Sequence, residues 1–443
     1  MRWAAAATLA WMKVLPGLVL LLWFLSAAAA LTEAVLPTRI AGGLALLISI
    51  GAVLNHSGFS RWIAVLLGGG GAIVAFYRDD WPALLDGLGR AATFAAFLGC
   101  LYALRSFVQT APQLREVQDA FVAFRPVSRR GAVQFLGFLF SVPLAVGTVS
   151  VVAPLISRQK DQAVREETAS WALRGMGLAV LFSPFTVAMG VVTSSLGERL
   201  PFGVLLGSGF ALAVLLMAFP HVLGICRIPR RLPRRFWEAL ARVLFPVLIL
   251  IAANLSLVFL FGFTPPQATI LLVPPLGAAL ALYRGKAVRR QMTSITLDAW
   301  RRFDSEVGIF VGALVFASVI TRVPEISEVV GQTVEMFGPG ALIAIAMVGI
   351  AVPTALGLHM VVTVTILLTV FAPAMPDVLH LVLLGLSGLI GWAFGAMAAL
   401  GSIGFLAATR IFDVSARRLA LGSNLRFMTV VMLLLIVVSI GIG

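Results

Sequence analysis

Two short stretches that share one pattern decide the fold class of this sequence. They are Val142-Pro143-Leu144-Ala145-Val146-Gly147 and Val352-Pro353-Thr354-Ala355-Leu356-Gly357, and each lies inside a long apolar run. Proline removes a backbone donor and glycine permits unusual backbone angles, so the shared V-P-x-A-x-G favours a turn within an apolar helix. We therefore predict two re-entrant helical hairpins, over residues 131–156 and 339–372.

The composition around these stretches is that of a membrane protein. Of the 443 residues, 60% are hydrophobic and 12% are charged, whereas a soluble domain carries about 25% charged residues. The net charge of +14 comes from short basic clusters between apolar runs, as in cytoplasmic loops, and not from a continuous basic face for nucleic acid. Cys100 and Cys226 are too few for a disulfide framework or a zinc site, and we interpret both as packing residues.

Further apolar runs are long enough to cross about 30 Å of hydrocarbon. We predict about 11 transmembrane helices, at residues 14–31, 40–54, 62–77, 91–107, 171–196, 202–222, 243–262, 268–283, 307–320, 380–407 and 426–442. Residues 1–30 also fit a signal peptide, with Arg2 and Lys13 before an apolar run and small residues. We expect them to be retained, because polytopic permeases need no cleaved signal.

The basic clusters fix the expected orientation. If both hairpins return to the side that they enter from, the clusters at 227–235 and 410–418 lie inside, as does Lys13, while acidic residues gather in outer loops. If one hairpin were instead a full span, one of these clusters would lie on the wrong side. The N-terminus is then cytoplasmic and the C-terminus is outside.

The sequence also repeats itself at an offset of about 212 residues. Phe97, Gly99 and Leu101 match Phe310, Gly312 and Leu314, and Pro112, Glu116, Phe124 and Pro126 match Pro324, Glu328, Phe337 and Pro339. We predict an N-terminal helix at 1–38, a first repeat at 39–226 and a second at 227–443. Each repeat has three spans, an amphipathic surface segment (108–125 or 321–338), a hairpin and two more spans. Five spans per repeat force an inverted topology, which is typical of secondary transporters with a site at the bilayer midplane.

The candidate site consists of hydroxyls, glycines and one histidine, because no Asp or Glu lies in the middle of a predicted span. The candidate substrate-binding residues are Ser141, Pro143, Gly147, Thr148, Ser183, Thr186, Thr193, Thr354, Gly357, His359, Thr363 and Ser402, with Na⁺ expected near Gly147, Ser183, Gly357 and Gly395. Unwound carbonyls and hydroxyls suit Na⁺, and half-helix N-termini suit an anion. The alternative is structural: such small residues also pack membrane helices closely, and His359 also fits a neutral histidine bonded to a carbonyl.

This plan resembles the ion-transporter superfamily, which includes the divalent-anion/sodium symporters and the large membrane subunits of tripartite periplasmic-binding-protein-dependent transporters. The resemblance rests on the hairpins at 142–147 and 352–357, the interrupted spans at 183–186 and 388–404, and the inverted parity. It implies a scaffold and an elevator-like transport unit, often in a homodimer, that carries organic anions with Na⁺ or H⁺. The Ser-Asn-Thr hairpin tips of the dicarboxylate symporters are absent, and Ser141 and Thr354 are the nearest counterparts.

We therefore expect a secondary transporter of a small anionic organic solute in a bacterial-type inner membrane, with no resident cofactor, no nucleic-acid partner and membrane lipid around it. A membrane subunit of a tripartite-type transporter is the main alternative. A membrane-embedded enzyme would need convergent catalytic groups, yet His56, His221, His359 and His380 are scattered. A channel would need a filter motif or a charge ring, and the sequence has neither.

Overall fold

The described part of the chain is all-helical. The computed structural model describes residues 2–55, 59–110, 126–144, 148–152, 161–226, 234–400 and 402–442, and no strand occurs among them. Eight of the described helices are long and apolar enough to cross a membrane, or up to ten if two bent helix pairs each form one span. This architecture confirms the all-α class and fits an integral membrane protein, while the count of eleven spans and the two re-entrant hairpins stay predictions.

The chain divides into two compact units, and each takes residues from both halves of the sequence. Unit 1 comprises residues 1–110 and 252–332, and unit 2 comprises residues 111–251 and 333–443. These units differ from the division at residues 226 and 227 that the repeat suggests, because contacts join the corresponding segments of both halves.

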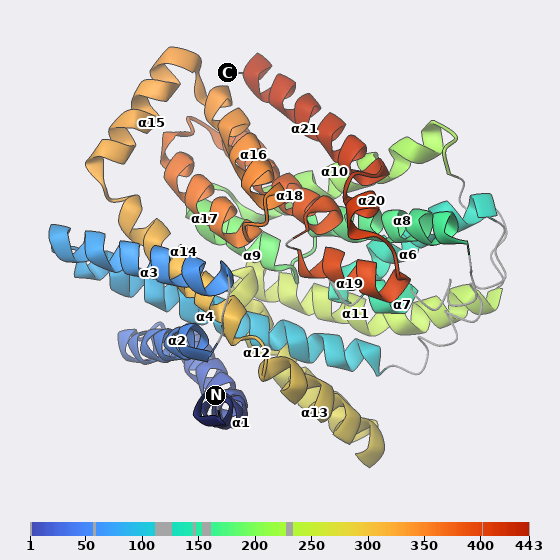
Figure 1. Cartoon of the computed structure of the whole chain (residues 1–443), viewed down its shortest axis with the longest axis horizontal. Helices are drawn as coiled ribbons and strands as arrows, with labels where there is room; N and C mark the ends of the chain where they lie inside the picture. The colour runs from blue at the N-terminus through green and yellow to red at the C-terminus, as the bar shows by residue number, and fades with distance from the viewer. Residues whose placement is uncertain are drawn as a thin grey trace. The chain divides into compact units, whose positions relative to one another are not determined.

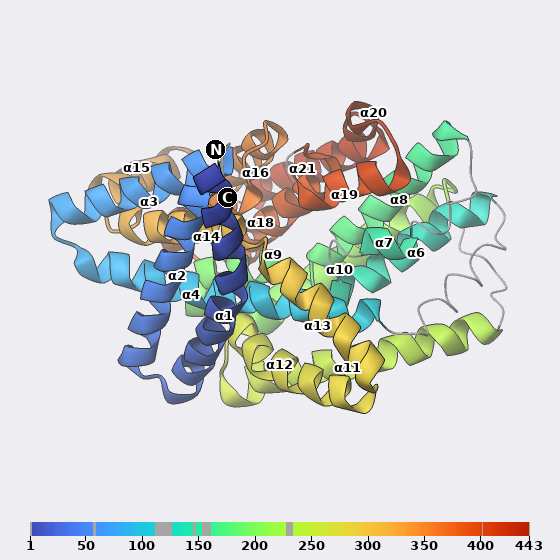
Figure 2. The ribbon, with the colours of Figure 1, turned by 60° about the horizontal axis from the view of Figure 1, so that its bottom comes forward.

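Unit 1 is built around α14 (Figure 1). Its helices are α1 (Arg2–Thr32), α2 (Val35–Asn55), α3 (Phe59–Arg78), α4 (Trp81–Gln109), α12 (Pro265–Tyr283), α13 (Lys286–Trp300) and α14 (Asp304–Ile320), with the ends of α11 (Arg234–Phe261) and α15 (Pro324–Phe337). The central α14 packs against α2, α3 and α4, and α1 lies beside α2 (Figure 2). Local sequence starts these helices: Asp80 accepts the amide of Ala83 at the start of α4, and Thr264 and Gln267 form a capping box on α12.

Small residues let the helices of unit 1 approach closely. A Cβ atom on Gly87 would lie 2.8 Å from the Cα atom of Val315, and one on Gly71 would lie 3.1 Å from the Cα atom of Phe316. Side chains at these positions would push α3 and α4 away from α14. Glycine therefore serves close helix packing here, as is common in membrane proteins.

Unit 2 contains two long helices that are each followed by a break and a shorter helix. Its helices are α6 (Pro126–Leu144), α7 (Thr148–Val152), α8 (Gln162–Val180), α9 (Val187–Leu196), α10 (Phe202–Val222), α16 (Pro339–Ala355), α17 (Met360–Phe371), α18 (Val378–Ala398), α19 (Ile403–Phe412), α20 (Ala416–Ala420) and α21 (Ser423–Ile442), with single 3₁₀ turns at Gly197–Arg199 and Ala372–Ala374. Most of α11 (residues 234–251) and the last residues of α15 (333–337) also belong to unit 2. α8 and α18 pack against each other.

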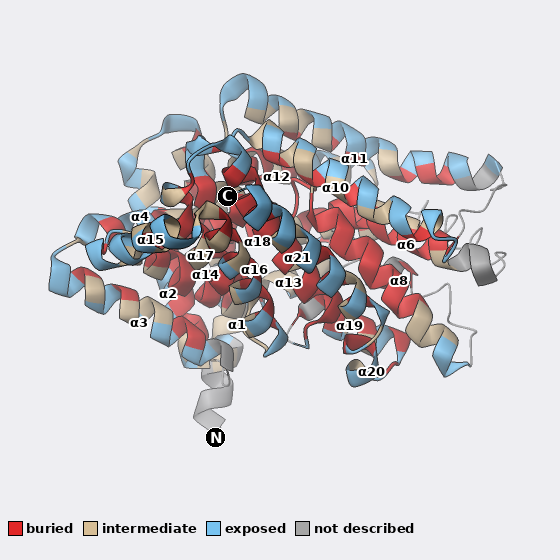
Figure 3. Ribbon diagram, turned by 90° about the horizontal axis from the view of Figure 1, so that it is seen from above, coloured by how far each residue is buried: buried red, intermediate tan, exposed pale blue. Residues whose placement is uncertain are grey.

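Burial separates the inner helices of unit 2 from the outer ones. The residues of α8 from Thr168 to Val180 are all buried, and so is almost all of α18 (Figure 3). On α10, in contrast, Phe210, Leu215 and Phe219 are exposed large apolar residues. A helix with an apolar exposed face is suited to lipid, so α8 and α18 form the core and α10 the lipid-facing side of unit 2.

Helix contacts within and between the two halves of unit 2 follow one pattern. α6 packs against α7 and α8, as α16 packs against α17 and α18. α9 packs against α17 and α18, and α19 packs against α7 and α8. The shorter helix after each break (α9 or α19) therefore contacts the second helix of the pair (α17 or α7) and the long helix (α18 or α8) of the other half.

Candidate functional site

The candidate residues from the sequence all belong to unit 2, and the described ones lie in or next to α6, α7, α9, α16, α17, α18 and α19. Gly147 lies outside the described residues, as does most of the segment 108–125. The counterpart at 321–338 contains α15, a single amphipathic helix as expected. Whether α15 lies along a membrane stays a prediction.

The first break confirms the expected interruption at Ser183-Pro184-Phe185-Thr186. α8 ends at Val180 and α9 begins at Val187, and Pro184 contributes no amide hydrogen to continue the helix. Thr186 caps α9: its Oγ1 accepts the amide of Met189 at 3.2 Å and donates to the Ser183 carbonyl at 2.9 Å. Both hydroxyl side chains are buried, so the break is stabilised by its own side chains.

The first helix pair, α6 and α7, is joined to the break between α8 and α9 by hydrogen bonds from hydroxyl side chains. The Ser183 Oγ donates to the Val142 carbonyl at 2.9 Å and accepts the amide of Phe185 at 3.3 Å. The Ser141 Oγ donates to the Thr148 Oγ1 at 2.8 Å, from the end of α6 to the start of α7. Ser141, Thr148 and Ser183 therefore lie in one connected region, and each has a hydrogen-bond partner.

The Thr193 hydroxyl does not take part in this network, because it is hydrogen-bonded within its own helix. Its Oγ1 donates to the Met189 and Gly190 carbonyls of its own helix, at 2.8 and 3.0 Å. Thr363 is similar, since its Oγ1 donates to the Met360 carbonyl at 3.3 Å. These bonds to the preceding turn are the usual structural use of Thr in a helix.

The second break is shorter than the sequence suggests. α18 continues past Gly388, Gly391 and Gly395 to Ala398, and α19 begins at Ile403 after Ser402, whose hydroxyl caps it. The span is interrupted within 388–404 as expected, but only after Ala398, and Gly388, Gly391 and Gly395 lie inside the continuous helix. They serve packing instead: a Cβ atom on Gly391 would lie 2.3 Å from the Cγ2 atom of Ile350.

In the second helix pair, the chain turns between α16 and α17 at residues 356–359. Gly357 has φ +99°, which L side chains rarely adopt, and the Leu358 amide donates to the Pro353 carbonyl at 2.9 Å. His359 then caps α17, because its Nδ1 accepts the Val361 amide at 3.3 Å. The histidine therefore has a structural role in addition to any ligand role.

Thr354 is the candidate residue with an unused polar atom. Its side chain is 1% exposed, and its Oγ1 has no hydrogen-bond partner. A Cβ atom on Gly395 would lie 2.8 Å from the Thr354 Cγ2 and 3.2 Å from the Met360 sulfur, so Thr354 lies where α16, α17 and α18 meet. A buried hydroxyl without a partner is costly in a folded protein, and a ligand oxygen or cation there would remove that cost.

Arg174 is a buried charge in unit 2, although its sequence position near a predicted helix end suggests a side chain that reaches the membrane surface or attracts an anion. Only 5% of it is exposed, and its Cζ lies 4.4 Å from the ring centroid of Trp171 and 4.5 Å from that of Phe427. Its Nε donates to the Asn424 Oδ1 at 3.1 Å. The guanidinium joins α8 to α21 through stacking and a hydrogen bond.

Unit 1 holds one buried and one half-buried carboxylate that the sequence pattern did not reveal. Asp304 is 1% exposed and accepts the Trp11 Nε1 hydrogen at 2.8 Å. The hydroxyl of Tyr102 donates to Glu306, with distances of 2.8 and 2.9 Å to the two carboxylate oxygens. No group of three or more His, Cys, Asp or Glu side chains suited to a metal ion occurs within the described ranges.

Comparison with known proteins finds no protein-family model and no curated protein that matches the chain.

Proposed function

We propose that the protein is a secondary transporter of a small anionic organic solute and that unit 2 carries the transport site. The observation that carries this proposal is the matched pair of buried broken helices, α8/α9 and α18/α19. Each second segment starts at a hydroxyl cap and packs against the helices of the other half. Broken helices in matching positions of two repeats are how secondary transporters build a midplane site.

The same contacts support an inverted repeat. V-P-x-A-x-G occurs at the ends of α6 and α16, and each of these helices packs against the long broken helix of its own half. α9 packs against helices of the second half and α19 against helices of the first half, as expected for two repeats related by a pseudo-two-fold axis in the membrane plane. On this proposal α6/α7 and α16/α17 are the two re-entrant hairpins, the N-terminus is cytoplasmic and the C-terminus is outside.

The division of the chain supports alternating access. Unit 1 combines the spans that precede the hairpins in both halves, except for most of α11, and unit 2 combines both hairpins with both broken helices. A unit that contains the whole site is able to move as one body against the other. Unit 1 is then the scaffold, and unit 2 is the transport unit of an elevator-like mechanism.

The chemistry of unit 2 favours an anion. No Asp or Glu occurs in the sequence of either hairpin or of either interrupted span. The N-terminal ends of α9 and α19 carry the positive ends of helix dipoles and amides without helical acceptors, which attract carboxylate or other oxyanion groups. Carbonyls at the breaks and the Thr354 hydroxyl are oxygen ligands for a coupling Na⁺.

Thr354→Val is the sharpest test of the site. The substitution keeps the shape of the side chain and removes a buried hydroxyl that has no protein partner, so the folded protein should be equally stable or more stable. Transport into proteoliposomes should fall at least about tenfold if the hydroxyl contacts solute or ion. Thr365→Val is the matched control, because Thr365 is also 1% exposed and without a partner for Oγ1 but lies farther along α17. Equal transport by wild type and Thr354→Val would contradict this site.

The solute class and the coupling ion are tested by thermal unfolding of the purified protein. The panel contains mono-, di- and tricarboxylates, sulfonates and inorganic oxyanions, each with and without Na⁺ and at two pH values. A bound ligand raises the apparent stability by mass action. A shift from one anion class that requires Na⁺ would support a sodium symporter, and silence over the panel would count against an anionic solute.

His359→Gln tests proton coupling separately. If transport uses protonation of His359, the variant should lose the pH dependence of uptake, while Gln keeps a polar side chain at the start of α17. An unchanged pH profile would leave His359 with its capping role alone.

A further inference from the structure

Unit 1 contains a polar cavity at one end of its helices. Its volume is about 740 Å³, and its walls come from the end of α1, the start of α2, the start of α4 and the start of α12. These four helices are all long and apolar enough to span a membrane. The ends of spanning helices lie at the membrane surface, so the cavity lies at the depth of lipid headgroups.

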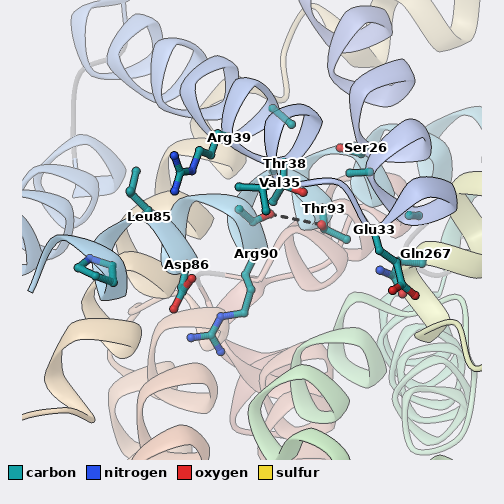
Figure 4. A pocket seen from close by; sticks show the side chains of 16 residues that line it. Ser26, Glu33, Val35, Thr38, Arg39, Leu85, Asp86, Arg90, Thr93 and Gln267 are labelled. Atoms are coloured by element: carbon teal, nitrogen blue, oxygen red, sulfur yellow. Dashed lines mark hydrogen bonds between the residues drawn. The ribbon is translucent and has the colours of Figure 1, made fainter.

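Two opposite charges in the cavity have no protein partner. The side chains of Glu33 and Arg39 line it and make no hydrogen bond or ion pair with other described residues. Figure 4 shows Glu33 and Gln267 on one side of the cavity and Arg39 and Asp86 on the other. The cavity therefore offers a carboxylate at one side and a guanidinium at the other.

The other charges of the cavity are already engaged. Asp86 pairs with Arg322 at 2.8 Å, and the guanidinium of Arg90 donates to the Ser318 hydroxyl. These pairs join α4 to the end of α14 and leave the charges of Glu33 and Arg39 free for a ligand.

A further observation points to a ligand. Ser26 lines the cavity, is 5% exposed, and its hydroxyl has no hydrogen-bond partner. Glu33 is held at the mouth of the cavity by the helix end: it has φ +53°, and its amide donates to the Ala29 carbonyl at 2.9 Å as a left-handed cap of α1.

The rim of the cavity is apolar. Val35 and Leu85 line it and are 62% and 44% exposed, and Leu31 and Leu36 nearby are 65% and 68% exposed. A water-soluble zwitterion would gain nothing from these side chains, whereas acyl chains would cover them.

We propose that this cavity binds a phospholipid whose headgroup carries a primary amine beside a phosphate. The ammonium donates to Glu33, the phosphate accepts from Arg39, and the acyl chains lie on Val35 and Leu85. Guanidinium–phosphate and ammonium–carboxylate contacts are charge-assisted and therefore among the stronger hydrogen bonds. The site is separate from the proposed transport site in unit 2.

The test uses the full-length protein, purified and stripped of lipid in detergent. Native mass spectrometry and thermal unfolding compare phosphatidylethanolamine, phosphatidylcholine and phosphatidylglycerol with equal acyl chains. We expect retention and stabilisation by phosphatidylethanolamine, because phosphatidylcholine has no ammonium hydrogen to donate and phosphatidylglycerol has no cation. Equal binding of the three lipids would overturn the proposal without any variant.

Two variants assign the headgroup contacts. Glu33→Gln and Arg39→Gln should each weaken phosphatidylethanolamine binding at least about tenfold, with unfolding of the lipid-free protein unchanged. Glu198→Gln and Arg61→Gln are the matched controls, since they change exposed residues that do not line the cavity. Unchanged binding in both cavity variants would overturn the assignment. Soluble glycerophosphoethanolamine distinguishes the source: if it binds as tightly as the lipid, the cavity takes a free solute and the lipid proposal is wrong.

Discussion

Ser183→Ala tests the claim that hydroxyls stabilise the first helix break. The side chain is 0% exposed, and its Oγ donates to the Val142 carbonyl at 2.9 Å and accepts the Phe185 amide at 3.3 Å. Alanine leaves both backbone groups buried without this partner. Each such group costs about 1–3 kcal/mol, so for the two groups we expect a loss of about 2–6 kcal/mol in the free energy of unfolding.

Ser387→Ala is the matched control for this substitution. Ser387 is also 0% exposed, but its Oγ donates to the Leu384 carbonyl within the continuous α18 helix. The Leu384 carbonyl lies inside a continuous helix, where backbone hydrogen bonding does not depend on the serine hydroxyl. The loss in the free energy of unfolding should therefore stay below about 1 kcal/mol. Equilibrium unfolding of both variants in the same detergent measures the difference. Equal losses at positions 183 and 387 would refute the view that Ser183 closes the break.

Two further predictions concern packing and charge in unit 2. Gly391→Ala places a Cβ atom 2.3 Å from the Ile350 side chain and should lower the free energy of unfolding by about 1–3 kcal/mol. Gly207→Ala, with open space around the glycine, is the control and should not destabilise the protein. Similar unfolding of the two variants would be inconsistent with close packing of α18. The backbone amide and imidazole of His380 lower the pKa of the Asp377 carboxyl below its ordinary 3.8. This stabilisation is therefore present above pH 3.8 and is lost as the pH falls through the folded pKa, so Asp377→Asn should reduce the acid sensitivity of thermal unfolding, and an unchanged sensitivity would count against the pair.

The sequence predicts the places where the backbone itself must deviate from a helix. Ser183-Pro184 marks the first break because proline cannot donate and the neighbouring hydroxyls replace lost backbone bonds. Gly357 marks the second turn because its φ of +99° suits glycine. Both signals are local, so they can be read along the chain. The glycines from 388 to 395 were misleading because glycine also allows close packing within a continuous helix.

Features that depend on distant residues could not be predicted in this way. Trp11 and Asp304 are hydrogen-bonded although they lie 293 positions apart in the sequence. In the sequence, Glu33 and Arg39 are ordinary charges near a helix end and a helix start, and only the packing of other helix ends places them on the wall of one cavity. The division into two units likewise follows from tertiary contacts, because each unit combines segments from both halves.

The two halves of unit 2 differ in a way that bears on the expected ligand. At the first break and its helix pair α6/α7, Ser141, Thr148, Ser183 and Thr186 satisfy one another or nearby backbone groups, so a ligand there would have to displace existing hydrogen bonds. In the second helix pair, α16/α17, the Thr354 hydroxyl is buried without a partner. Binding beside Thr354 gains a hydrogen bond and loses none, so its net free energy is more favourable than binding at the first break. We therefore expect substitutions at the second helix pair to weaken solute binding directly, and those at the first break to act through stability.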